Sequence, residues 1–374
     1  LFKLLQLGLQ ITDVKDIDTS EFATLSKEEW TTIKEMAVKQ GVSAIVLDGI
    51  NQLPLAGYNL PTEMKLEWIG ETMQIEQRNR QQVAVMEDLA EKWKINGSRV
   101  MIMKGQANGT MYPKPEHRSP GDIDCYLFNC NINPNDNLND DKEAYRIGND
   151  IARAVGAKVD ESWYKHSVIS YKGETFENHQ YFVHTRDGKR GKMLNQELVE
   201  QLRVEGLEFR ELPAAPAVVI PPVQWAAMFL TYHACAHFIS EGLRLKQILD
   251  WAIFLDKHQN DVDWEAFWGF CERNHLLVFA EAMNTIAERW FGVKCHTEST
   301  ENTEIFESPY AERIMKSALY DEDYVFNSGK SGWANRIHLV RNMFRYRWKY
   351  EEVYQTSVWK QLWWYASGYL LRTE

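Results

Sequence analysis

The spacing of apolar residues changes along the chain, and the changes predict three regions. In the first, residues 1–97, apolar side chains recur at helical spacing. Ser26 followed by Glu29 is a capping-box pattern that predicts a helix start, and Pro61-Thr62 opens a second long helical segment. Asn96-Gly97 predicts the end of that segment, because Asn and Gly favour helix C-termini. We therefore expect an N-terminal helical region.

Short alternating runs replace the helical spacing in the middle of the chain and predict strands. Val100–Met103 is a short apolar run, and apolar and polar residues alternate over Asp122–Phe128. Lys172-Gly173 joins two further strand-like runs and predicts a hairpin. We expect this region, residues 98–212, to form a core built on a small mixed β-sheet.

Helical spacing returns after a segment with four prolines, residues 213–222, which we interpret as a linker. Asp263-Trp264 and Ser308-Pro309 both resemble helix starts, the second with proline at the first helical position. Residues 213–374 are therefore predicted to form a C-terminal helical domain. The fold class expected from this order is α+β, with the small sheet between two helical regions.

Composition narrows the classes of protein to which the chain can belong. Of its 374 residues, 44% are hydrophobic, which excludes an intrinsically disordered chain. Its 42 Lys and Arg against 53 Asp and Glu leave a net charge of −11, which excludes a general binder of duplex nucleic acid. The five cysteines include no Cys-x-x-Cys pair, so we expect reduced thiols and a cytoplasmic location. No apolar run is long enough for a transmembrane segment, and the first ten residues do not resemble a signal peptide.

Asp122 and Asp124 are the most informative polar residues, because a period of two would place both carboxylates on one face of a strand. Two adjacent anions repel each other, and Mg²⁺ is the usual compensating cation where phosphate oxygens share the site. A neighbouring strand carrying Glu177 would add a third carboxylate. Three carboxylates around one or two metal ions form the arrangement for in-line phosphoryl or nucleotidyl transfer. The alternative is a strand whose acidic side chains are merely solvated.

The residues around the two aspartates resemble a known family. Its pattern runs Lys-Gly, a Tyr-Pro turn, an arginine, then Gly-Asp-Ile-Asp, and later Glu-x-His. In this chain the pattern falls on Lys104-Gly105, Tyr112-Pro113, Arg118, Gly121–Asp124 and Glu177–His179. The segment thus resembles the bacterial uncharacterised nucleotidyltransferase family, distant members of the DNA-polymerase-beta-like nucleotidyltransferase superfamily. A later helical pattern on His233, Arg244 and Asp250 also resembles that family.

The resemblance implies a nucleotidyltransferase-like core and a role for each matching residue. Asp122 and Asp124 would hold Mg²⁺ against a nucleoside triphosphate. Glu177 would complete the metal site and help to deprotonate the acceptor hydroxyl. Lys104 and Arg118 would contact phosphates, for which an arginine offers paired donors.

One departure from the superfamily pattern concerns the phosphate-binding turn. The wider superfamily carries Gly-Ser or Gly-Gly there, whereas this chain has Gly105-Gln106. Lys104, or the backbone N–H groups that follow Gly105, would then have to hold the phosphates. His179 would position the acceptor or a metal ligand, or would only make a local hydrogen bond. Three residues would be accessory to the site: His233, Arg244 and Asp250.

These features predict a nucleotidyltransferase, dependent on Mg²⁺ or Mn²⁺, that moves a nucleoside monophosphate from an NTP such as ATP. The acceptor would be a small molecule, a sugar or a protein. One alternative is a catalytically silent relative that binds a nucleotide or a partner protein, because the Gly-Ser motif is missing. Another is a peripheral membrane or nucleic-acid adaptor acting through residues 336–371, where basic and aromatic residues interleave.

Overall fold

The computed structural model describes residues 1–129, 139–185, 188–204, 207, 209–295, 307–321 and 333–363. The chain divides into two compact units, which we describe separately. The first comprises Leu1–Thr185 and Met193–Ala226, and the second comprises Arg186–Lys192 and Ala227–Glu374. The division of the sequence into three domains remains a prediction.

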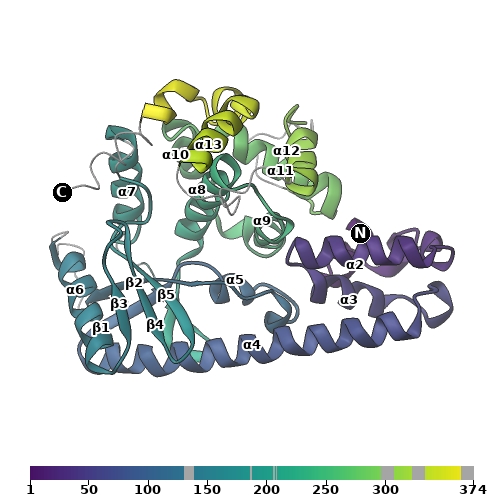
Figure 1. Cartoon of the computed structure of the whole chain (residues 1–374), viewed down its shortest axis with the longest axis horizontal. Helices are drawn as coiled ribbons and strands as arrows, with labels where there is room; N and C mark the ends of the chain where they lie inside the picture. The colour runs from purple at the N-terminus through teal and green to yellow at the C-terminus, as the bar shows by residue number, and fades with distance from the viewer. Residues whose placement is uncertain are drawn as a thin grey trace. The chain divides into compact units, whose positions relative to one another are not determined.

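Helices make up the N-terminal part of the first unit. The α-helices are α1 (Phe2–Gly8), α2 (Lys27–Lys39), α3 (Ser43–Gln52) and α4 (Thr62–Ile95), with short 3₁₀ turns η1 (Val14–Asp16), η2 (Ser20–Ala23) and η3 (Leu55–Gly57). The predicted capping box is present at α2, where Glu29 N–H donates to Ser26 Oγ and Ser26 N–H donates to the Glu29 carboxylate. Helix α4 is 34 residues long and reaches from α3 to the sheet (Figure 1).

A seven-stranded mixed sheet follows, in the order β3-β4-β5-β2-β1-β7-β6. The strands are β1 (Ser98–Ile102), β2 (Ile123–Asn129), β3 (Lys158–Asp160), β4 (His166–Tyr171), β5 (Glu174–His179), β6 (Arg210–Leu212) and β7 (Ala215–Ile220). Strand β2 pairs antiparallel with β1 and parallel with β5. The predicted hairpin is confirmed, since Lys172 (φ 48°) and Gly173 (φ 86°) make the two-residue turn between β4 and β5. The α+β class with helices on both sides of a small mixed sheet is thus confirmed.

The core lies between the sheet and helices α4 and α6 (Asn139–Ala154). Trp93 of α4 is fully buried, its ring meets Phe176 of β5 edge-on, and its indole N–H donates to the carbonyl oxygen of Gly148. Ile123, Cys125 and Leu127 of β2 belong to the same cluster. Because side chains alternate along a strand, the core takes one face of β2 and leaves Asp124 and Tyr126 on the other. Three further elements are α5 (Gln106–Gly109), η4 (Pro115–His117) and α7 (Lys189–Gln201), of which residues 189–192 belong to the second unit.

The proline-rich segment differs from the linker that the sequence predicted. Residues 215–220 form β7, which pairs parallel with β1 and antiparallel with β6. Pro216 is exposed, whereas the apolar run from Ala217 to Ile220 is buried. The backbone N–H of Ala217 donates to the carboxylate of Glu87 on α4 rather than to a strand. A proline has no backbone N–H to donate to a neighbouring strand, so it limits the hydrogen bonds of this segment but does not prevent it from forming a strand.

The second unit is helical. Its elements include α8 (Val223–Ser240), α9 (Leu245–His258), η5 (Gln259–Asp261), α10 (Trp264–Arg273), α11 (Leu277–Phe291), α12 (Ala311–Tyr320), α13 (Trp333–Arg345) and the π-helical turn η7 (Lys349–Val353). Asp263 caps α10 as predicted, accepting from Ala266 N–H at 3.0 Å. Helix α12 begins at Ala311, two residues after the predicted start at Pro309, and Ser308 Oγ instead accepts from Tyr310 N–H.

Part of the basic and aromatic stretch over residues 336–371 is turned inward. Lys349 is completely buried, with its ammonium 3.7 Å from Asp321 and over the ring of Phe238. Burial lowers the pKa of Lys349 to about 8. Residues 364–371 of the stretch lie outside the described residues. Among the helices that are described, none is both long and apolar enough to cross a membrane.

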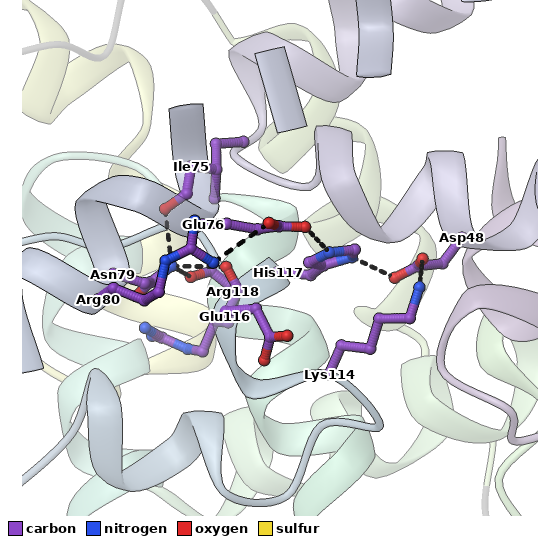
Figure 2. A network of polar contacts seen from close by, with 9 residues as sticks. All are labelled: Asp48, Ile75, Glu76, Asn79, Arg80, Lys114, Glu116, His117 and Arg118. Carbon is purple, nitrogen blue, oxygen red and sulfur yellow. Dashed lines mark hydrogen bonds and ion pairs between the residues drawn. The ribbon is translucent and has the colours of Figure 1, made fainter. Parts of the chain in front are cut away.

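An ion-pair network ties the N-terminal helices to the segment that leads into β2 (Figure 2). His117 of η4 lies between two carboxylates, with Nδ1 at 2.6 Å from Asp48 of α3 and Nε2 at 2.9 Å from Glu76 of α4. The ammonium of Lys114 also contacts Asp48 at 2.6 Å. The His117 side chain is only 7% exposed, so these contacts are poorly screened by solvent.

The two carboxylates set the charge of this histidine. Burial lowers the pKa of His117, but Asp48 and Glu76 more than offset this effect and raise the pKa above its ordinary value. In turn, His117 lowers the pKa of Glu76. Next to the network, the amide of Asn79 donates to the carbonyl oxygens of Glu116 and Arg118 (Figure 2). The loop that carries Arg118 is therefore held against α3 and α4.

We predict that Gly49→Ala destabilises the first unit by about 1–3 kcal/mol, the cost typical of overpacking. A Cβ at Gly49 of α3 would lie 1.9 Å from the Leu4 carbonyl oxygen of α1, so the two helices would have to separate. The matched control is Gly70→Ala on α4, where a Cβ meets nothing within 4 Å. That substitution should raise stability by up to about 1 kcal/mol. Urea unfolding measures both, and equal effects at the two glycines would contradict the close approach.

We also predict a pH-dependent loss of stability for His117→Asn. The raised pKa of His117 contributes stability below its unfolded value of 6.5, and this is lost as pH rises through the folded value. The lowered pKa of Glu76 contributes above 4.5 and is lost as pH falls through the folded value. The difference in unfolding free energy between wild type and variant should therefore be largest between pH 4.5 and 6.5. It should reach about 1–3 kcal/mol there.

Urea titrations across pH measure this difference. The control is the same substitution at His258, which pairs with Asp261 near the end of α9. A difference at His117 that does not change with pH would refute the charged network.

Candidate active site

The sheet places two carboxylates side by side at one end of β2. Asp124 of β2 and Glu177 of β5 are register partners in the parallel ladder. Partners in a ladder point to the same face, and here this is the face away from the core. The Asp124 side chain is 6% exposed and that of Glu177 is 26% exposed. The pairing brings together two of the three predicted carboxylates.

Asp122 lies just outside the strand. Strand β2 begins at Ile123, so Asp122 ends the loop that precedes it and is exposed. The expectation that both aspartates belong to one strand is therefore wrong for Asp122. The amide of Gln82 on α4 donates to the carbonyl oxygen of Gly121 at 2.7 Å and fixes this loop next to the strand.

Lys104 neutralises the buried aspartate. Its ammonium lies 2.5 Å from Asp124 Oδ2, immediately after β1 ends. A buried carboxylate is costly unless it is paired, and Lys104 supplies the opposite charge. Gly105 follows with a φ of 68°, so the chain turns away from the strand in a conformation that glycine adopts readily. A phosphate contact by Lys104 stays a prediction.

Two histidines complete the cluster. His179 Nε2 lies 3.3 Å from Asp124 Oδ1 and 3.4 Å from Glu177 Oε2. His166 Nδ1, on β4, lies 3.5 Å from the same Glu177 oxygen. The two rings face each other, since His166 and His179 are register partners in the β4–β5 hairpin.

His166 was not identified from the sequence, although the signal was present. A two-residue turn at Lys172-Gly173 fixes the register of the hairpin, and that register places His166 opposite His179. Ile169 and Tyr171 enter the core, so alternation places His166 on the opposite face with Glu177.

Burial and charge act against each other in this cluster. Burial lowers the pKa of His166 to about 4, although the charge of Glu177 opposes this. Burial raises the pKa of Glu177, but His179 and His166 outweigh it and hold that pKa below its ordinary value. On the core face of β2, burial raises the pKa of the Cys125 thiol well above its ordinary value. Cys125 is therefore a packing residue and not a nucleophile.

The remaining predicted phosphate contacts occupy tightly held positions. The Gln106 side-chain amide donates to Asn79 Oδ1 at 2.7 Å and to Gln82 Oε1 at 2.8 Å, so it is bound to α4. Arg118 is buried, and its carbonyl oxygen accepts from Asn79. Its contact with a phosphate stays a prediction.

The three predicted accessory residues all lie in the second unit. His233 of α8 has Nε2 at 3.2 Å from His237 Nε2, and its ring packs on Phe229. Arg244 precedes α9, and its backbone N–H donates to Gln247 Oε1. Asp250 is buried in α9. Their participation in the site stays a prediction.

The donor set around Asp124 and Glu177 fits a divalent cation. It offers carboxylate oxygens together with imidazole nitrogens, and the buried Nε2 of His179 makes no hydrogen bond. Within the described residues, ligand atoms of His166, Glu177 and His179 lie within 4.8 Å of one another. Such a set can hold a metal ion against phosphate oxygens.

Comparisons with known proteins identify the family of this chain. The chain matches the family model described as uncharacterised nucleotidyltransferase over residues 26–292, which include both carboxylates and the whole sheet. No protein of curated function matches it, and no solved structure does. The match covers about seven tenths of the sequence, so the chain belongs to this family of uncharacterised nucleotidyltransferases.

Proposed function

We propose that this chain is a Mg²⁺- or Mn²⁺-dependent nucleotidyltransferase that moves a nucleoside monophosphate from an NTP to a hydroxyl acceptor. Membership of the nucleotidyltransferase family supports the general reaction. The observation that carries the proposal is the pairing of Asp124 with Glu177 on adjacent parallel strands, beside the ammonium of Lys104. The acceptor is a small molecule, a sugar or a protein. A cytoplasmic location belongs to the same proposal.

Three carboxylates would hold the metal ion: Asp122, Asp124 and Glu177. The metal, when bound, neutralises charge on the triphosphate and on the leaving pyrophosphate. Asp124 is held in place by the strand and by Lys104, whereas Asp122 approaches from the preceding loop. Asp124 is therefore positioned more precisely than Asp122, because a strand holds a side chain more rigidly than a loop does.

The reaction is an in-line displacement at the α-phosphorus. The acceptor oxygen forms a bond to this phosphorus as the bond to the β-phosphate bridging oxygen breaks, and pyrophosphate leaves with that electron pair. Glu177, whose lowered pKa keeps it ionised, accepts the proton of the acceptor hydroxyl. Lys104, Arg118 and the backbone N–H groups after Gly105 contact phosphate oxygens in this proposal.

Four further residues complete the proposed roles. His179, which contacts both carboxylates, orients Glu177 and Asp124. The other three are accessory residues of the helical part: His233, Arg244 and Asp250.

A catalytically silent relative is the second candidate, and the position of Gln106 favours it. A serine in this turn would present a hydroxyl to phosphates, whereas the Gln106 amide is hydrogen-bonded to Asn79 and Gln82. Such a protein would bind a nucleotide or a partner protein without turnover. The proposed adaptor role of residues 336–371 gains less support, because Lys349 is buried rather than presented to a ligand.

We predict that Asp124→Asn reduces pyrophosphate release by at least about a hundredfold, as expected when a group that stabilises the transition state is lost. The assay measures pyrophosphate release from each of the four NTPs with Mg²⁺ or Mn²⁺ in cell extract, which supplies candidate acceptors. The matched control is Asp150→Asn, since Asp150 is an exposed residue of α6 that pairs with Arg153. This control should retain wild-type activity.

Calorimetry with each NTP and Mg²⁺ separates the two candidates. An active enzyme binds the nucleotide through the carboxylates, so Asp122→Asn and Asp124→Asn should each weaken binding. Wild-type binding without pyrophosphate release from any NTP would favour the silent relative. Equal binding by wild type and both variants would show that the nucleotide does not use this site.

A further inference from the structure

The cluster at the end of β5 brings carboxylate oxygens next to an imidazole nitrogen. Asp124 Oδ1 and Glu177 Oε2 lie 3.3 and 3.4 Å from His179 Nε2. Ionised carboxylate oxygens accept hydrogen bonds but cannot donate them. Lys104 approaches the other oxygen of Asp124, Oδ2. The Glu177 oxygen and the His179 nitrogen beside it therefore form a set that attracts a positive ion.

A backbone carbonyl fixes one hydrogen of His179. Its Nδ1 lies 3.1 Å from the carbonyl oxygen of Tyr181, which is an acceptor only, so Nδ1 donates there. Nε2 faces the two carboxylates, and an ion that displaces any proton at this position would meet its lone pair. Metal-binding histidines commonly have this arrangement, in which one nitrogen donates to a carbonyl and the other binds the ion. The His179 side chain is 1% exposed, and its Nε2 makes no hydrogen bond.

His166 supplies a second nitrogen from the neighbouring strand. Its Nδ1 is buried without a hydrogen bond and lies 3.5 Å from Glu177 Oε2. Two ligands that each lie about 2.1 Å from one ion are roughly 3.0–4.2 Å apart. Glu177 Oε2 lies 3.4 Å from His179 Nε2 and 3.5 Å from His166 Nδ1, and both separations fall in this range. All three ligand atoms lie within 4.8 Å of one another, and the hairpin register keeps the two histidines opposite each other.

We propose that His166, Glu177 and His179 bind a divalent first-row transition ion such as Mn²⁺, Co²⁺ or Zn²⁺ beside Asp124. The proposal rests on the proposed function and narrows it, because the ion at that site becomes a transition ion such as Mn²⁺ rather than Mg²⁺, and His179 becomes a ligand instead of only orienting the carboxylates. Mg²⁺ demands oxygen ligands, whereas imidazole nitrogens suit the transition ions. The site therefore selects a transition ion over Mg²⁺, and His166 becomes a ligand.

Co²⁺ alone is the probe, added to the full chain without nucleotide. We expect one ion per chain, with visible ligand-field absorption typical of nitrogen ligands. His166→Gln and His179→Gln should each weaken Co²⁺ binding by at least about tenfold. Removing a residue that only supports a metal ligand already costs about tenfold in affinity, so removing a ligand should cost at least as much. A large excess of Mg²⁺ should not displace the ion. Equilibrium dialysis gives the affinity, and the absorption spectrum gives the ligand type.

The matched control is His258→Gln. It removes an imidazole that lies at the end of α9, outside the proposed ligand set, and pairs with Asp261. Its Co²⁺ affinity and spectrum should remain those of wild type. Folding is checked by the thermal midpoint without metal. If His166→Gln unfolds, histidine-ring ¹H–¹⁵N spectra of the wild type decide the matter, because the signals of His166 and His179 must shift selectively on binding of diamagnetic Zn²⁺.

Each outcome separates this proposal from the proposed reaction. Unchanged Co²⁺ binding in the His166 and His179 variants, or displacement by Mg²⁺, would overturn the imidazole site and leave the carboxylate reaction possible. Imidazole-dependent Co²⁺ binding together with full pyrophosphate release by Asp124→Asn would confirm the metal site and refute the reaction at it. Absence of Co²⁺ binding would also overturn the proposal, with a shared proton then joining His179 to the carboxylates.

Discussion

Burial of the Asp124 carboxylate is the constraint around which the site is organised. A charge on a sheet strand, 6% exposed, requires a compensating charge close by. Lys104 supplies it from the end of β1, and His179 lies at the other oxygen from β5. Because Asp124 and Glu177 are register partners, this compensation also brings a second carboxylate to the same place. The strand order β4-β5-β2-β1 therefore creates the cluster, and the chemistry depends on that order.

Helix α4 stabilises this arrangement from outside the sheet. Asn79 and Gln82 bind the backbone of the loops at Arg118 and Gly121, and Gln106 binds both of these side chains in turn. Farther along the loop, His117 is held between Asp48 and Glu76. The polar side chains of a largely helical segment thus fix the chain that leads into β2. The Gln106 amide reaches two partners on α4, which the shorter side chain of a serine could not do.

Local signals in the sequence predicted much of the fold. The capping box at Ser26, the hairpin at Lys172-Gly173 and the alternation over β2 depend on neighbouring residues, and each is present. The proline-rich segment was wrongly predicted to be a linker, because prolines also flank strands. Whether β7 pairs with β1 depends on residues that are distant in the sequence. The start of β2 after Asp122 is likewise set by its partner, as Ile123 is the first residue to pair with β5.

The sequence was sufficient to name the acidic residues of the candidate site, but not to predict the contacts among them. Two aspartates at a spacing of two, with Lys104 before them, pointed to Asp124 and its chemistry. The contact of Lys104 with Asp124 follows from the burial of Asp124, which the sequence alone does not show. His166 required the hairpin register and the strand order together. Family membership agrees with the reaction class and leaves the substrate to experiment.

The central claim is that a cation binds between Asp124 and Glu177 and carries the nucleotide there. Anomalous diffraction from crystals grown with Mn²⁺ and a non-hydrolysable NTP tests it most directly. We predict a Mn²⁺ peak in contact with Asp124 and Glu177 and with a phosphate oxygen of the nucleotide. A nucleotide bound elsewhere, with the contact between Lys104 and Asp124 unchanged and no Mn²⁺ peak beside it, would contradict the account.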